Sequence, residues 1–346
     1  MRKALRFMTG FWMLVAGAGP AAAATIDLAD WQSYRDRFID GSGRVIDDAN
    51  DNISHSEGQG YGLLLAFLAD RPADFEQIWS FTRTELLIRD DGLAAWTWNP
   101  TATPRITDIN NATDGDILIA YALSEAGAAW KRDDYMDAAR KIAQAVLDKA
   151  VIAHDGETQL LPGVDGFSAK DRPDGPVVNP SYCVFEAFPA LNKVVPSEKW
   201  QALSDGCHSL LKRARFGPKK LPAEWVSLAG TPKPADGFAP EFAYNALRIP
   251  LYLLRGGIED RALLADLRSG MSDAAGSITI VDLPTGDIKK VLDDPGYQSI
   301  NHLVACVLDG TPLPALARRF LPTVYYPSTL HLLVLAYIAA KRPECR

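Results

Sequence analysis

The segment Ala112-Thr113-Asp114-Gly115-Asp116-Ile117-Leu118-Ile119-Ala120-Tyr121-Ala122-Leu123 places two acidic residues at the start of a run that is apolar on every side. A helix that is apolar all round is buried, whereas a helix with one charged face lies at a surface. Residues 330–340 are likewise apolar on nearly every side. Residues 134–149 instead alternate charged residues with Ala, Ile and Val. The sequence therefore predicts inner helices wrapped by outer ones, as in an α/α barrel.

Helical periodicity extends along most of the chain and predicts about twelve helices, hence an all-α protein built from six helical hairpins. The predicted ranges are 30–39, 58–68, 73–88, 114–131, 134–152, 180–194, 197–215, 240–255, 260–272, 298–308, 314–320 and 328–341. In such a barrel the cleft lies at the end where loops and helix termini meet.

Strand character is confined to one region. Residues 277–282 and 288–292, joined through Pro284-Thr285-Gly286, predict a small β-hairpin insertion. Two long connections, 154–179 and 217–239, are rich in Pro, Gly and polar residues. We interpret them as loops that form the cleft.

The first 24 residues have the pattern of a secretory signal peptide. Three basic residues precede an apolar run over residues 7–18, and Pro20 and four alanines follow. We therefore predict a signal at 1–24, a single domain over 25–346, a periplasmic or secreted location, and no membrane span after cleavage.

Charge and cysteine content exclude several classes of protein. The chain carries a net charge of −7, and about −10 without residues 1–24, so nucleic acid is not an expected partner. The four cysteines, Cys183, Cys207, Cys306 and Cys345, are scattered, and their pairing stays open among three connectivities. The five histidines are equally dispersed, and no metal site is predicted.

Acidic residues stand at the start of two apolar helical runs. Glu57 lies in Ser54-His55-Ser56-Glu57-Gly58-Gln59-Gly60-Tyr61-Gly62, and Asp114 and Asp116 begin the other run. Cleavage of a glycosidic bond needs one carboxyl to protonate the departing oxygen and another to direct water or attack the sugar carbon. The two helix starts predict such a pair. Because a general acid must keep its proton, we expect burial or the charge of Asp114 to raise the pKa of Glu57.

Each of these acids also has a purely structural explanation. Ser54 and Glu57 match a capping box, in which the glutamate bonds back to the backbone. Asp114 and Asp116 are favourable charges in the first turn of a helix. The residues alone leave both explanations open.

Other chemistries lack their motifs. The glycines at 58, 60 and 62 form GxGxG rather than the GxGxxG of a nucleotide-binding loop, and no strand is predicted before them. Neither G-x-S-x-G nor H-E-x-x-H occurs, which argues against serine hydrolases and zinc proteases. Trp96 and Trp98 carry flat amphipathic rings that can stack on sugars. Alternating tryptophans also occur, however, in hydrophobic cores, where they serve only packing.

A series of ordered motifs spans the chain. They are Gly43-Arg44-Val45-Ile46-Asp47, Ser56-Glu57-Gly58-Gln59-Gly60-Tyr61-Gly62, Ala95-Trp96-Thr97-Trp98, Ala112-Thr113-Asp114-Gly115-Asp116, Asn179-Pro180-Ser181-Tyr182, Tyr244-Asn245-Ala246-Leu247-Arg248 and Tyr325-Tyr326. Together they resemble glycoside hydrolase family 8, most closely the periplasmic endo-β-1,4-glucanases that accompany bacterial cellulose synthases.

The resemblance implies an (α/α)6 barrel with a long open cleft that cuts β-1,4-glucan internally and inverts the anomeric centre. It implies no cofactor, and it makes the cellulose synthase complex a candidate partner. Glu57 matches the general acid of the family. Asp114 matches an acidic residue that is expected to hold the sugar at the cleavage point, with Asp116 in support. The remaining candidate substrate-binding residues are Trp96, Trp98, Tyr182, Tyr244, Asn245, Arg248 and Tyr326.

The chain departs from close relatives at Asn245, where they carry the aspartate that serves as base. An amide orients water but does not take its proton. Three explanations stay open: Asp114 or Asp116 acts as base, another acid such as Glu241 one helical turn earlier reaches in, or the protein is weakly active or inactive. An inverting enzyme needs its base about 6.5 to 9.5 Å from the acid.

Several functions therefore remain to be distinguished. The leading one is endoglucanase activity on cellulose or a related β-glucan. Chitosan, xylan and mixed-linkage glucan are alternative polymers within the same family. A protein that binds glucan without cutting it is an alternative of another class, kept open by Asn245, and an all-helical scaffold for protein partners is a third.

Overall fold

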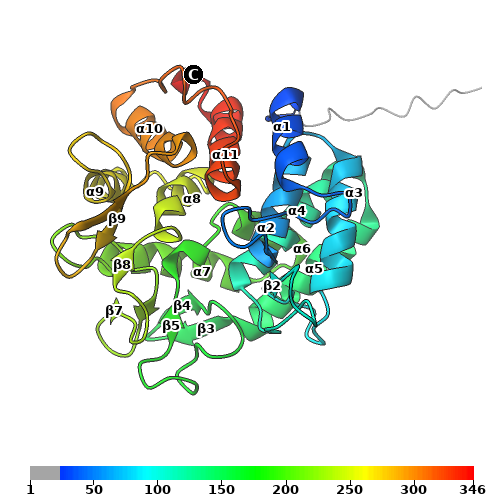
Figure 1. The fold of residues 1–346 in the computed structure, drawn as a ribbon. Helices are drawn as coiled ribbons and strands as arrows, with labels where there is room; N and C mark the ends of the chain where they lie inside the picture. The colour runs from blue at the N-terminus through cyan, green and yellow to red at the C-terminus, as the bar shows by residue number, and fades with distance from the viewer. Residues whose placement is uncertain (1–23) are drawn as a thin grey trace, which may run out of the picture.

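The computed structural model describes residues 24–346, so the predicted signal peptide, apart from Ala24, lies outside the described residues. Within this range the chain forms eleven α-helices and several short strands (Figure 1). The helices are α1 Leu28–Phe38, α2 Ser56–Leu68, α3 Pro72–Phe81, α4 Thr113–Trp130, α5 Asp133–Lys149, α6 Ala187–Val194, α7 Glu198–Arg213, α8 Ile249–Arg255, α9 Arg261–Met271, α10 Pro295–Asp309 and α11 Tyr325–Lys341.

The helices alternate between two layers, which confirms the predicted α/α barrel. The outer helices α1, α3, α5, α7 and α9 each precede an inner partner, and α11 completes the inner ring. Around that ring α2 packs on α4, α4 on α6, α8 on α10, α10 on α11, and α11 on α2. A 3-10 turn, Pro180–Tyr182, packs against α8 beside the start of α6.

The ring closes between the first and last helices of the described chain. Besides the packing of α11 on α2, α1 lies against α11. There the Tyr34 hydroxyl hydrogen-bonds to the Thr329 hydroxyl at 2.8 Å, in a buried contact between residues 295 positions apart.

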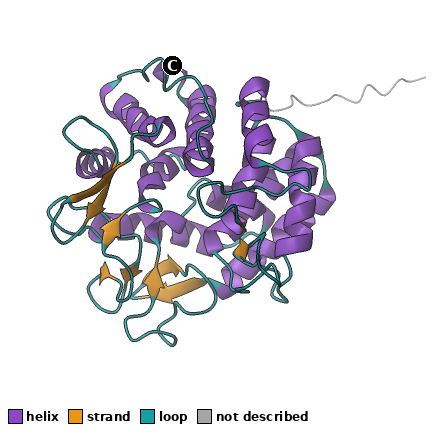
Figure 2. Cartoon of the chain, in the orientation of Figure 1, coloured by secondary structure: helices purple, strands orange, loops and turns teal. Residues whose placement is uncertain are grey.

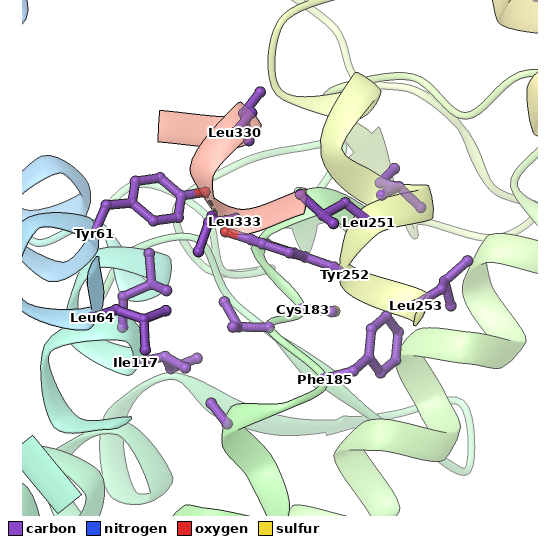
Figure 3. Packing of buried hydrophobic residues seen from close by; sticks show 14 of the residues in the cluster. Tyr61, Leu64, Ile117, Cys183, Phe185, Leu251, Tyr252, Leu253, Leu330 and Leu333 are labelled. Carbon is purple, nitrogen blue, oxygen red and sulfur yellow. Dashed lines mark hydrogen bonds between the residues drawn. The ribbon is translucent and has the colours of Figure 1, made fainter. Parts of the chain in front are cut away.

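The inner helices are held by a continuous apolar core. Figure 3 shows Tyr61 of α2 and Tyr252 of α8 pointing at each other from opposite sides of the ring, with their hydroxyls hydrogen-bonded. Gly60 allows α2 to approach α4 closely, because a Cβ there would lie 2.6 Å from the Cβ of Leu118. The glycines of the GxGxG pattern thus include one that serves helix packing.

One predicted helix is absent. Residues 314–320 form consecutive turns in the place of the outer helix that would precede α11. The segment is less than two helical turns long and lies between Pro312 and Pro322. So short a helix makes few hydrogen bonds to offset the cost of ordering it, and the prediction was wrong there.

Two other predicted helices are shorter than expected. The range 240–255 contains strand β8 Glu241–Phe242 and a 3-10 turn Ala246–Arg248 before α8 begins. Pro250 lacks the N–H that a helix interior requires, so it lies in the first turn of α8. The range 180–194 likewise becomes helical only at α6, whose first turn contains Pro189.

The predicted hairpin is confirmed as β9 Thr279–Asp282 paired with β10 Ile288–Val291. The expectation of one strand region was wrong, because four small antiparallel sheets are present (Figure 2). The other strands are β1 Ser54–His55, β2 Thr97–Trp98, β3 Val151–His154, β4 Glu157–Leu160, β5 Val177–Val178, β6 Val226–Ser227 and β7 Lys233–Pro234. Most are two residues long, too short to show an alternating pattern.

Both pairs of cysteines form disulfides. Cys183 bonds Cys207 of α7, and Cys306 of α10 bonds Cys345 next to the C-terminus. The first bridge fastens the segment between the 3-10 turn and α6 to an outer helix. No helix in residues 24–346 combines the length and apolarity that crossing a membrane requires.

Candidate active site

A cleft of 770 Å³ opens where the N-termini of α2, α4 and α11 meet the loops. Of the predicted site residues it is lined by Glu57, Trp96, Asp114, Tyr182, Tyr244, Asn245 and Tyr326. Further lining residues include Asp47, His55, Lys290, Asp293, Asp294 and Tyr297. The cleft thus combines carboxylates with aromatic rings.

Glu57 lies in the first turn of α2, but it does not cap the helix. His55 is the N-cap, and its Nδ1 accepts a hydrogen bond from the Gly58 N–H at 2.9 Å. The Ser54 hydroxyl instead donates to the Val45 carbonyl at 2.5 Å. The capping-box explanation is therefore wrong, and the carboxylate of Glu57 is free to face the cleft.

A single guanidinium joins Glu57 to Asp114. Arg248 donates from Nη1 to Oε2 of Glu57 and from Nη2 to Oδ2 of Asp114, both at 2.6 Å. The Arg248 side chain is 0% exposed, while those of Glu57 and Asp114 are 16% and 1% exposed. Arg248 therefore lies beneath the cleft rather than in its lining, and it fixes both carboxyls from below.

The carboxyls of Glu57 and Asp114 also hydrogen-bond to each other. The pair shares one proton, which lies on Asp114 in the free protein. Burial and the negative charge of Glu57 raise the pKa of Asp114 to about 8. Burial alone would raise the pKa of Glu57, but the charges of Arg248 and His55 lower it below its usual value. The expected rise for Glu57 is thus wrong for the free protein, in which Asp114 holds the proton.

Arg248 is itself held by the turn that carries Tyr182. Its Nε donates to the Ser181 carbonyl at 3.3 Å, and Nη1 also reaches the hydroxyls of Tyr61 at 3.4 Å and Tyr326 at 3.5 Å. Its guanidinium carbon lies 5.8 Å from the centre of the Tyr182 ring. These contacts connect the charged pair to two rings that line the cleft.

Besides Arg248, two predicted site residues lie outside the cleft lining. Asp116 is buried, with Oδ1 accepting from the Ala94 N–H at 2.7 Å and Oδ2 from the Asn111 amide at 2.9 Å. Trp98 packs against Phe81 and donates to Glu85. Both support the segment that carries Trp96, whose ring is 37% exposed in the cleft.

The structure bears on each proposed base. Glu57 and Asp114 touch, so no water fits between them, and both oxygens of Asp116 are occupied. Glu241 lies on strand β8 rather than on a helix, and its carboxylate contacts Lys289 Nζ at 2.6 Å. Asp114 thus leaves no room for a water beside Glu57, Asp116 has both oxygens engaged, and Glu241 is paired with a lysine.

Sequence reasoning missed three residues of the site. His55 Nε2 lies 3.4 Å from Oδ2 of Asp47, and its position as N-cap before Glu57 was the available signal. Although burial opposes it, the hydrogen bond to Asp47 and the charge of Glu57 raise the pKa of His55. Glu224 contacts Asn245 from the connection 217–239, which we interpreted as a cleft-forming loop, but nothing in the sequence singles out this acid within it.

The approach of α2 to α4 at the acid is tight enough to test by substitution. A Cβ on Gly115 would lie 2.7 Å from the Glu57 backbone nitrogen, and closer still to the Ser56 hydroxyl. We expect Gly115→Ala to destabilise the protein by about 1 to 3 kcal/mol and to lower kcat, because backbone cannot move aside cheaply. Thermal unfolding and kinetics check this against Gly127→Ala in the same helix, where the closest atoms belong to the flexible Met136 side chain. Equal effects of the two substitutions would contradict it.

Within residues 24–346 no group of three or more His, Cys, Asp or Glu is arranged to hold a metal ion. The carboxylates of Glu57 and Asp114 are instead paired with Arg248, and that of Asp294 accepts the Gly296 N–H.

The chain is similar to known glucanases in sequence and structure. The sequence profile described as "Glycosyl hydrolases family 8" matches residues 6–264. An endoglucanase of Cellulomonas uda is 39% identical over 64% of this chain and 62% of its own length. A probable endoglucanase of Novacetimonas hansenii is 34% identical over 94% of this chain and 93% of its own. The structure of endo-beta-1,4-glucanase CMCax from Acetobacter xylinum superposes with a TM-score of 0.80 at 33% identity, covering 90% of this chain and 96% of that one.

Proposed function

The chain belongs to glycosyl hydrolases family 8 and is a glycoside hydrolase of the endoglucanase type, and from this premise we propose that it cuts β-1,4-linked glucan internally with inversion. The observation that carries the proposal is the Glu57–Arg248–Asp114 group at the floor of an open cleft with aromatic walls. An open cleft admits a long polymer between its ends, which endo-cleavage requires.

The aromatic residues suit a chain of glucose units. Trp96, Tyr182, Tyr244 and Tyr326 present rings to the cleft, where they can stack on the apolar faces of pyranose sugars. Carboxylates and amides between the rings accept and donate hydrogen bonds to sugar hydroxyls. Binding a neutral polymer does not require charged groups in the cleft. The acidic residues there are instead available for the proton transfers of bond cleavage.

In the proposed mechanism the pair of Glu57 and Asp114 supplies one proton. In the free protein Asp114 holds it, and Glu57 is the more exposed of the two. A glycosidic oxygen that displaces water from Glu57 removes solvation from its charge, which favours transfer of the proton from Asp114. Glu57 then protonates the leaving oxygen, while Asp114, still bonded to Arg248, holds the sugar at the cleavage point.

We further propose that the enzyme is exported and serves cellulose synthesis. The signal-like pattern of residues 1–24 supports export, and the likeness to CMCax of Acetobacter xylinum supports a role beside a cellulose synthase. A deletion strain tests the role: it should make cellulose in altered amount or packing, and wild-type gene but not a Glu57→Gln version should restore it. Unchanged cellulose would contradict the role.

The activity is tested on carboxymethylcellulose with the purified protein, by viscosity and by new reducing ends. We expect a rapid fall in viscosity with few new ends, and a product anomer opposite to that of the bond cleaved. Xylan, chitosan and mixed-linkage β-glucan are measured in parallel.

The outcomes distinguish the remaining functions. Preferential cleavage of one of the other polymers would replace the proposed substrate. Binding of cello-oligosaccharide without cleavage, with activity gained in Asn245→Asp, would favour a glucan-binding protein instead.

A further inference from the structure

The cleft lacks an assigned group to take the proton of the attacking water. Glu57 and Asp114 are in contact, and both are engaged by Arg248. Asp47 faces His55, beside the acid, and Asp294 accepts from the Gly296 N–H as the N-cap of α10. A base must instead lie across the cleft from Glu57, with room for a water and a sugar carbon between.

Glu224 is the acid held against Asn245, a residue of the cleft lining. Its Oε1 accepts the Asn245 N–H at 2.6 Å. Asn245 lines the cleft, three residues before Arg248. Glu224 itself is only half-buried.

The loop around Glu224 holds the carboxylate in place. Trp225 is stacked between two rings, with centroid distances of 4.5 Å to Phe238 and 5.6 Å to Phe167. The next two residues form β6, the central strand of the β5–β6–β7 sheet. The Glu224 N–H donates to the Glu241 carbonyl at 3.2 Å. A carboxylate fixed on both sides in this way is preorganised for proton transfer.

We propose that Glu224 is the general base of the cleft and acts on a water that the Asn245 side chain orients. The water oxygen bonds to the anomeric carbon, and its proton passes to the Glu224 carboxylate. The bond from that carbon to the glycosidic oxygen breaks, and the oxygen takes the proton held by the Glu57 and Asp114 pair. Exchange with solvent then restores both sites. This inference rests on the proposed function.

Burial and the charges around Glu224 act on the pKa of the proposed base. Burial and the nearby Glu241 raise the pKa of Glu224, against the hydrogen bonds from Asn245 and the charge of Arg248. The base acts only when ionised, so kcat/KM falls as the pH drops through this pKa. A raised pKa moves that acidic limb above the range of an ordinary glutamate.

The test compares Glu224→Gln with three matched variants on cello-oligosaccharides. Glu241→Gln removes the neighbouring acid, Asp293→Asn removes an exposed acid of the cleft, and Glu57→Gln removes the acid itself. We expect Glu224→Gln to lose on the order of 10² to 10⁴-fold in kcat with KM little changed, and to lose the acidic limb of the pH profile. Asp293→Asn should lose far less activity than Glu224→Gln and keep the acidic limb. Glu241→Gln should also keep this limb, moved to lower pH, because the charge of Glu241 raises the pKa of Glu224. Gln at 224 can still accept the Asn245 N–H, and thermal unfolding checks the fold.

Azide separates a base from a structural residue. It attacks the anomeric carbon without giving up a proton, so it should restore cleavage in Glu224→Ala and yield a glycosyl azide of inverted configuration, but it should not restore Glu57→Gln. A folded Glu224→Gln with wild-type kcat, no azide product, or a loss confined to Asp293→Asn would overturn the inference while leaving the glucanase intact. A wild-type protein that cuts no β-glucan would overturn the proposed function, and this inference with it.

Discussion

Glu57→Gln lowers kcat on β-1,4-glucan by on the order of 10² to 10⁴-fold, the contribution of a positioned general acid. Glutamine keeps an oxygen for the 2.6 Å bond from Arg248, so the fold and substrate binding should persist. Loss of catalysis is distinguished from loss of binding or folding by three measurements on one preparation: initial rates, cello-oligosaccharide affinity and thermal unfolding. Glu85→Gln, which removes an acid that bonds Trp98 away from the cleft lining, is the control and should remain active.

The same proton sets the alkaline limit of the enzyme. The pair of Glu57 and Asp114 carries one proton below the pKa of Asp114, about 8, and loses it above. We therefore expect kcat/KM to fall as the pH rises through about this value. Asp114→Asn should move or remove this limb. An activity that stays level well above pH 8 would mean that the pair does not supply the proton.

Arg248→Met should cost both stability and activity. Removal of one partner from a buried ion pair leaves uncompensated charge and typically costs about 3 to 5 kcal/mol, and here two carboxylates lose their donor. Arg255→Met is the matched control, since Arg255 is a buried arginine bonded to Glu186 at 2.6 Å outside the cleft lining. We expect a large loss of stability in both, measured by denaturant unfolding.

Activity per folded molecule distinguishes the two arginines. It should be nearly abolished in Arg248→Met, because the carboxyls lose their shared position and Glu57 loses the charge that lowers its pKa. It should be retained in Arg255→Met at temperatures where the protein is folded. Equal specific activities would show that Arg248 serves only the fold.

The distribution of apolar residues in the sequence made the inner helices of the barrel predictable. The runs that are apolar all round became α4 and α11, because a helix without a polar face has no stable place at a surface. Helices interrupted by proline were placed with wrong starts, since periodicity does not reveal where a backbone N–H is missing. Strands of two residues, such as β1 and β6, are defined by a partner elsewhere in the chain and carry no local pattern.

The candidate site was predictable only in part, for related reasons. Glu57 and Asp114 stand at helix starts, where an acid has a recognisable context, but the choice between capping and catalysis depended on His55 and Arg248. Asp116 also stands at a helix start, but its oxygens accept hydrogen bonds from the Ala94 N–H and the Asn111 amide, so its role is structural. Glu224 meets Asn245 across 21 residues whose only regular elements are three two-residue strands, so the contact arises only in the tertiary structure.

The closure of the ring by α11 affects how the protein folds during its synthesis. The Tyr34–Thr329 contact and the packing of α11 on α2 join the two ends of the described chain. During synthesis the last inner helix emerges from the ribosome after all the others, and contacts between distant residues form slowly. Tyr326 of the cleft arrives with that helix. A C-terminally clipped chain therefore carries the acid without a finished cleft, and we expect it to cut no β-glucan.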